Sequence, residues 1–120
     1  MVIHGAEKTY RGARLPEGGV NVGVFWTDDA GGRRARTLPP RNDLWNHSPD
    51  GFEWGYSGSG PAQLGLAILA DATGEDEVAV REHQRFKAAF IVPLPQSEPW
   101  EIKASVVLAW LRASGMAVAL

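Results

Sequence analysis

The sequence predicts an α+β fold: a small antiparallel β-sheet of about three to five strands packed with three helices, as a single domain over residues 1–120. A length of 120 residues suits one hydrophobic core. Period-two apolar alternation marks the first third, and helical patterns bounded by Pro and Gly fill the second half. Strands grouped ahead of helices, rather than alternating with them, are typical of an α+β architecture.

The first third predicts a three-stranded antiparallel meander. Its clearest strand carries Val20, Val22 and Val24 at every second position, which is the pattern of a strand with one buried face. Pro39 and Pro40 end the third strand, because proline donates no hydrogen bond to a sheet. We expect strands at 9–14, 20–26 and 33–38, with turns at 16–19 and 28–32.

The connection over residues 39–60 is long for a domain of this size, so we expect it to be ordered and packed. Residues 48–51, Ser-Pro-Asp-Gly, have the preferences of a type I turn. A short strand is expected at 52–56. The connection ends in a glycine-rich stretch that leads into the first helix.

A first helix is expected at 61–73. Gly60 is an acceptable N-cap, Pro61 suits the first turn, and Gly74 supplies a left-handed residue after the last turn. The helix is apolar almost all round and is predicted to be the most buried.

Two further helices and an edge strand complete the prediction. Carboxylates at 75–77 favour the start of a helix that runs to about residue 90. His83 lies on its apolar face and is expected to be a buried core histidine. A strand is expected at 100–103, followed by a helix at 105–114 that buries Val106, Trp110 and either Val107 or Leu111.

Composition excludes several classes of protein. Apolar residues make up 44 % and charged residues 22 %, which is typical of a folded globular chain. The formal charge is −2, whereas a nucleic-acid-binding domain typically has an excess of Lys and Arg. Without cysteine there is no disulfide, thiol nucleophile or thiolate metal site. Residues 1–10 lack the apolar segment of a secretory signal, so we expect a cytoplasmic protein with no membrane association.

Aromatic residues in the connection are the first candidate site. A stretch of twelve residues contains Trp45, Phe52, Trp54 and Tyr56 and leads into the glycine-rich segment. Exposed aromatic rings on a rigid loop are typical of protein-binding hot spots. The alternative is that these rings cap the sheet and the first helix.

The glycine-rich residues before the first helix are the second candidate. Ser57, Gly58, Ser59 and Gly60 could present backbone N–H groups to a phosphate at the helix N-terminus. They match neither a Walker A loop nor a dinucleotide-binding glycine pattern, and Pro61 removes one donor. Anion binding therefore remains the alternative.

No catalytic residue, metal ligand or cofactor is assigned. His47, Ser48, Asp50 and Glu53 include a base, a hydroxyl and two carboxylates, but the turn already explains Ser48 and Asp50. The three histidines, at positions 4, 47 and 83, lack metal-ligand spacing.

Arginines form the only basic cluster of the sequence. On a strand, Arg34 and Arg36 point to one face and Arg33 to the other, while Arg41 lies beyond the strand. The cluster is therefore split, and we do not expect a nucleic-acid partner.

The segment 46–64, NHSPDGFEWGYSGSGPAQL, resembles the signature of a family of small proteins of unknown function found widely in phages, plasmids and other mobile elements. The resemblance extends more loosely to residues 86–87, 100 and 110–111, and so to about the last two-thirds of the chain. Gly65 stands where the family leads us to expect alanine, which bears on stability or close packing.

The resemblance implies a setting rather than a reaction. It favours a non-enzymatic accessory module that binds a host protein, for example in a defence system, through the aromatic loop at 45–60. The alternative is a protein that binds phosphate or a nucleotide through residues 57–60, either as a simple binding protein or as an enzyme. Neither the identity of the partner nor the oligomeric state follows from the sequence.

Overall fold

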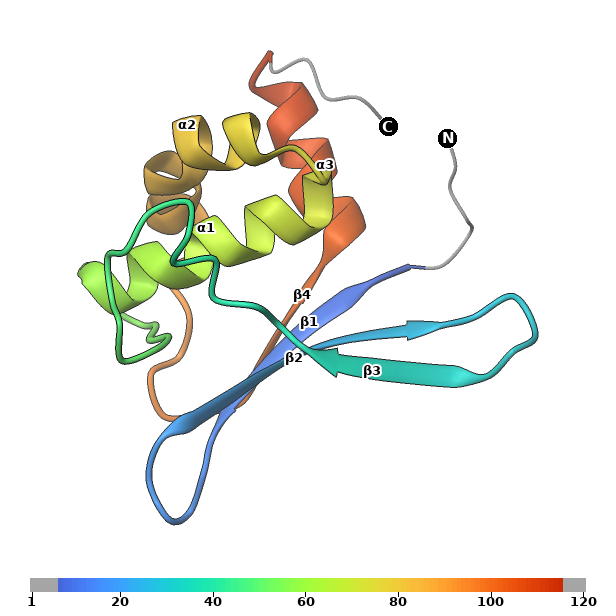
Figure 1. Ribbon diagram of the computed structural model, residues 1–120, viewed down its shortest axis with the longest axis horizontal. Coiled ribbons are helices and arrows are strands. Elements are labelled where there is room, and N and C mark those ends of the chain that lie inside the picture. Colours follow the sequence, from blue (N-terminus) through green and yellow to red (C-terminus); the bar gives the residue numbers. More distant parts are fainter. Residues whose placement is uncertain (1–6, 116–120) are drawn as a thin grey trace.

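The computed structural model describes residues 7–115, and its sheet has four antiparallel strands in the order β3-β2-β1-β4. Figure 1 shows the helices gathered on one side of the sheet and the β2–β3 hairpin reaching beyond them. The predicted α+β class and the three-stranded meander are confirmed, and the expected edge strand pairs with β1. The strands are β1 (Thr9–Arg14), β2 (Val20–Thr27), β3 (Arg33–Thr37) and β4 (Trp100–Lys103).

The strand register places the apolar residues on the face toward the helices. Val24 is paired with Tyr10, and Tyr10 with Ile102, so all three side chains point the same way and are buried. Both predicted turns are present: Gly18 and Gly19 have positive φ angles, and Asp28 Oδ1 accepts hydrogen bonds from two backbone N–H groups of the second turn.

Two glycines in the middle of the sheet make room for aromatic rings. A Cβ on Gly12 would lie 2.4 Å from the buried Trp100 ring, which therefore lies flat against the strand on the helix side. A Cβ on Gly23 would lie 2.9 Å from the half-buried Phe25 ring on the other face. The guanidinium of Arg11 covers that ring at 4.9 Å from its centroid.

The first helix, α1 (Ser59–Thr73), begins two residues earlier than predicted, with Gly58 as its N-cap. Pro61 is then the third helical residue and still lies among the positions whose N–H has no partner within the helix. Gly74 ends α1 in the left-handed conformation, with φ 68°, as expected. Almost every residue of α1 is buried. No helix in the described range, 7–115, is long and apolar enough to span a membrane.

Asp71 joins α1 to the sheet. Its carboxylate accepts hydrogen bonds from the Tyr10 hydroxyl at 2.8 Å, from Lys8 at 3.1 Å and from Arg36 at 2.6 Å. Burial acts to raise the pKa of Asp71, but these three donors outweigh it and hold the pKa below its ordinary value. A polar side chain in the most apolar helix is thus fully partnered.

The second predicted helix is divided. It consists of α2 (Asp76–Phe86) and a π-helical turn, η1 (Lys87–Ile91), in which Val92 N–H donates to Lys87 O at 3.0 Å. The wider turn accompanies an aromatic cluster: Phe86 and Phe90 stack with centroids 4.7 Å apart, and Trp110 meets both rings edge-on. His83 is 1 % exposed, which confirms the expectation that it is buried.

Two local expectations were wrong. In α3 (Ala104–Ala113), Val107 and Leu111 are both buried, whereas Val106 is 50 % exposed because it lies a residue away from the face that meets α1. Residues 52–56 form no strand, since Trp54 turns into the core and Gly55 adopts a positive φ of 85°.

Gly65 allows α1 and α2 to approach closely. A Cβ at this position would lie 3.3 Å from the carbonyl oxygen of His83, closer than an ordinary van der Waals contact. Gly65, where alanine was expected, therefore serves the close packing of α1 and α2 beside His83, a residue of the site described below.

Candidate functional site

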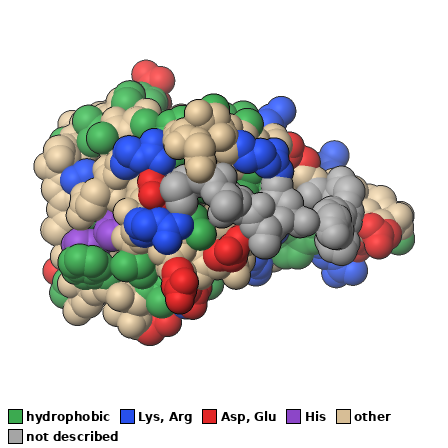
Figure 2. Space-filling view, turned by 90° about the horizontal axis from the view of Figure 1, so that it is seen from above, with side chains coloured by type: hydrophobic (Ala, Val, Ile, Leu, Met, Phe, Trp, Pro, Cys, Tyr) green, Lys and Arg blue, Asp and Glu red, His purple; other side chains and the backbone are tan. Residues whose placement is uncertain are grey.

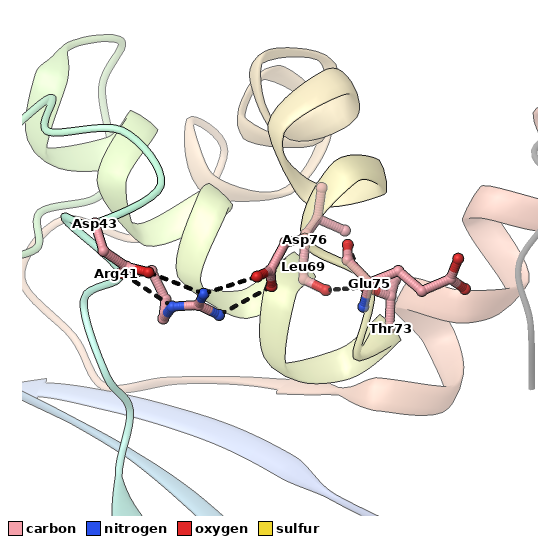
Figure 3. A network of polar contacts seen from close by, with 6 residues as sticks. All are labelled: Arg41, Asp43, Leu69, Thr73, Glu75 and Asp76. Carbon is pink, nitrogen blue, oxygen red and sulfur yellow. Dashed lines mark hydrogen bonds and ion pairs between the residues drawn. The ribbon is translucent and has the colours of Figure 1, made fainter.

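The β3–α1 loop, residues 38–58, is attached to α2 by an arginine at its start. Arg41 has a left-handed backbone, φ 57°, which turns the chain and directs the guanidinium to Asp43 and Asp76 at 3.0–3.1 Å (Figure 3). Thr73 fixes the adjoining corner, because its hydroxyl donates to Leu69 O and accepts the N–H of Glu75 (Figure 3). The start of α2 and the start of the loop are thus held together.

Gln63 of α1 holds the middle of the loop. The side chain is 0 % exposed, and its Oε1 accepts the backbone N–H groups of His47 at 2.8 Å and Ser48 at 3.1 Å. Its Nε2 donates to Pro40 O at 2.7 Å. One buried amide therefore satisfies three backbone groups of a segment that has no secondary structure of its own.

A histidine pair joins the loop to α2. His47 Nε2 lies 2.8 Å from His83 Nε2, and the ring centroids are 5.0 Å apart, close to the greatest separation that this nitrogen distance permits. The two nitrogens therefore meet head-on, as in a linear hydrogen bond, rather than converging on a shared ligand.

The partners of His83 determine which nitrogen carries the proton. Its Nδ1 lies 2.8 Å from Val80 O and 3.2 Å from Ala79 O, and both are acceptors, so Nδ1–H is the donor. In the neutral ring Nε2 is then an acceptor, and His47 donates its Nε2–H to it. The Nδ1 of neutral His47 retains a free lone pair.

Trp45 completes the site. Its ring stacks on His47 with centroids 4.9 Å apart and planes 10° apart, and it also meets His83 at 5.6 Å. The side chain of Trp45 remains 50 % exposed. Figure 2 shows histidine at the surface beside hydrophobic side chains. A large ring is thus held rigidly while half of it faces solvent.

The other predicted aromatic residues have different surroundings. Trp54 is 0 % exposed, packed edge-on against Trp100 and covered by Arg14, so it belongs to the core and not to a contact surface. Phe52 is half-buried against the core. Tyr56 is 41 % exposed, with its ring against Gly58. The expected four-residue surface is reduced to two well-exposed rings, Trp45 and Tyr56.

The glycine-rich residues pack against an ion pair. Gly60 is buried against Glu53, so that a Cβ on Gly60 would lie 2.7 Å from that of Glu53. The Glu53 carboxylate pairs with Arg14 at 2.8 Å. The cation beside the start of α1 is therefore already paired with a carboxylate of the protein.

The catalytic candidates do not form a nucleophile–base pair. Ser48 lies in the predicted turn, where its carbonyl accepts Gly51 N–H at 3.5 Å, and His47 faces His83. Among residues 7–115 no group of three or more potential metal-ligating side chains occurs, and His4 lies outside the described residues.

The arginine cluster is largely neutralised by carboxylates. Arg34 pairs with Asp28 at 2.7 Å, Arg36 with Asp71 at 2.6 Å, and Arg41 with Asp43 and Asp76. A surface of paired charges offers little to a phosphate backbone, because those cations already have anionic partners.

A family model for DUF6166, a family of unknown function, matches residues 10–113. The chain belongs to DUF6166. The DUF6166 match begins in β1 and ends in α3, so it covers the whole sheet as well as the loop and helices, and exceeds the two-thirds expected from the signature segment. No curated protein and no solved structure matches the chain.

Sequence reasoning missed Gln63, His83 and Arg41 as parts of one site. Gln63 was visible only as a polar residue in an apolar helix, and Arg41 as part of a basic cluster. A polar side chain at a position predicted to be buried is the signal that finds Gln63 and His83, because a buried amide or imidazole requires partners.

Proposed function

We propose that this DUF6166 protein is a non-enzymatic protein-binding module whose contact surface is centred on Trp45. The observation that carries the proposal is the half-exposed Trp45 ring stacked on His47, which in turn bonds to the buried His83. Tryptophan is enriched among the residues that contribute most to binding. A ring that is already immobilised loses little conformational entropy when a partner binds.

The charges around Trp45 indicate the chemistry of the partner. Residues 42–59 contain Asp43, Asp50 and Glu53 but no Lys or Arg. The Arg41 side chain is only 26 % exposed, whereas those of Asp43 and Asp76 are 65 % and 51 % exposed. The complementary surface should therefore have an apolar centre for the ring and cationic groups opposite Asp43 and Asp76.

The resemblance to mobile-element proteins extends this proposal. In that setting the partner would be a protein of the host, and a component of a defence system is one example. The setting is an argument by analogy, and it does not affect the assignment of the contact surface.

Affinity capture with matched variants tests the proposal. The full chain, Trp45→Ala and Val106→Ala are used as baits in nuclease-treated lysate of the native cells; Val106 is equally exposed, 50 %, but lies on α3. We expect one stoichiometric protein with the wild type and Val106→Ala, and a dissociation constant raised at least about 30-fold by Trp45→Ala, the effect of a hot spot of about 2 kcal/mol. Equal affinity for Trp45→Ala, or no stoichiometric protein, would reject the proposal.

Phosphate or nucleotide binding by residues 57–60 is the alternative. The ion pair between Glu53 and Arg14 argues against it, since this arginine already has a carboxylate partner and offers little to a further anion. A bound nucleotide would raise the melting temperature, because a ligand of the native state alone stabilises it. We expect no shift with millimolar phosphate, ATP or GTP.

A further inference from the structure

The His47–His83 hydrogen bond accommodates a limited number of protons. Nδ1 of His83 is committed as a donor to Val80 O, and the bridge between the Nε2 atoms contains one proton. One additional proton can be taken up on Nδ1 of His47 without breaking the bridge. The loop then stays attached to α2 through a charge-assisted bond.

A second additional proton is incompatible with this geometry. It would place hydrogen on both Nε2 atoms, which face each other at 2.8 Å, and would make both rings cations. His83 is 1 % exposed and bonded to its own helix, whereas His47 lies on a loop. Separation of the pair therefore requires His47 to move away from α2.

The groups around His47 oppose its protonation. The Lys87 ammonium of η1 and His83 of α2 both disfavour a positive charge on His47. Gln63 of α1 and Trp45 of the loop, which also contact His47, are uncharged. Burial, followed by the charges of His83 and Lys87, lowers the pKa of His47 below its ordinary value. The attached state is thus the state that binds fewer protons.

We infer that acid releases the β3–α1 loop from α2, so that Trp45 is held in place at neutral pH and freed when the His47–His83 pair takes up a second added proton. The inference rests on the proposed function, because it concerns regulation of the same contact surface. The released loop loses the stacked arrangement of Trp45, and the affinity for the partner falls with it.

The pH dependence has a defined sign. Release of the loop takes up at least one more proton than the attached pair can hold, so attachment is strongest at neutral pH and weakens as the pH falls. In the pH range where release takes up one proton, the ratio of released to attached loop rises about tenfold per pH unit.

Residue-resolved hydrogen exchange of the full chain, without any partner, tests this inference. The probes are the N–H groups of His47 and Ser48, which donate to Gln63, and the N–H groups of Ile68 and Leu69 in the core report global unfolding. We expect the protection factors of His47 and Ser48, corrected for intrinsic exchange, to fall at least tenfold between pH 6.5 and pH 4.5. Those of the core should stay constant.

The control variant is His47→Gln, whose amide can donate to His83 but does not titrate. Its loop protection should be independent of pH over the same range. Constant loop protection in the wild type, the same fall in His47→Gln, or a simultaneous fall in the core would each overturn the inference. Because hydrogen exchange is measured without a partner, a negative result would not affect the binding proposal. Conversely, failure of the affinity capture would not change what the exchange data say about the loop.

Discussion

The buried side-chain oxygen of Gln63 accepts the backbone N–H of His47 at 2.8 Å, and this contact makes an irregular loop part of the core. The same oxygen accepts Ser48 N–H, and the amide nitrogen donates to Pro40 O. Backbone groups that would otherwise be buried without partners are thus satisfied by one side chain of α1. Trp45 lies between Pro40 and His47 in the sequence, so its position depends on these hydrogen bonds of Gln63.

Gln63→Ala should lower the free energy of unfolding by at least about 2 kcal/mol, because it leaves buried backbone donors without an acceptor. Urea unfolding at pH 7 measures this change. Gln84→Ala, at an exposed position of α2, is the matched control and should stay within about 0.5 kcal/mol of the wild type. Equal effects of the two substitutions would show that Gln63 does not hold the loop.

The two sheet glycines should respond differently to alanine. In Gly12→Ala the new methyl group meets the locked Trp100 ring, and we expect a loss of about 1–3 kcal/mol. In Gly23→Ala it meets the half-exposed Phe25 ring, which can swing into solvent, so the loss should be smaller. Thermal unfolding of both variants provides the comparison, and the reverse order would contradict the packing described.

At Arg41 glycine should be better tolerated than alanine. Both substitutions remove the ion pairs, but only glycine adopts a φ of 57° without strain, so Arg41→Gly should be more stable than Arg41→Ala by up to about 1 kcal/mol. Arg33, an exposed residue of β3, is the control, since alanine should be better than glycine in a strand. The same preference at both positions would argue against the left-handed turn at Arg41.

Asp71→Asn should lower stability at pH 7 by at least about 2 kcal/mol and flatten its acid dependence. The folded state holds the pKa of Asp71 below the ordinary value of about 3.9, so the carboxylate stabilises the protein above that pH and its contribution is lost as the pH falls through the lowered pKa. Urea unfolding between pH 7 and pH 2 measures both effects. Asp50→Asn, an exposed carboxylate in the loop, should leave both almost unchanged.

Local patterns were sufficient for most of the secondary structure. Alternation at Val20, Val22 and Val24 predicted β2, and Gly74 correctly marked the end of α1. The division of the second helix was not predictable, because a π-turn leaves no trace in apolar periodicity; here it accompanies the contact of Phe90 with Trp110. Propensity likewise gave no indication that α1 would begin two residues before Pro61.

The candidate site was only partly predictable, since its contacts join distant positions. The sequence drew attention to Trp45 as an aromatic residue in a loop, and to His83 as a buried histidine, but gave no reason to pair His83 with His47, 36 positions away. Trp54 and Trp45 look equivalent in the sequence, yet one is in the core and the other half-exposed. Which ring faces inward depends on the path of the loop, and that path is set by Gln63 and Arg41.

The most direct test of the account is NMR detection of the bond that supports Trp45, through the nitrogen–nitrogen coupling between His47 and His83 in uniformly ¹⁵N-labelled protein near pH 7.5. We expect a coupling between the two Nε2 atoms, with the proton on His47 Nε2 and a second proton on His83 Nδ1. Absence of the coupling, or a His83 ring protonated only on Nε2, would contradict it and leave the Trp45 surface without its support.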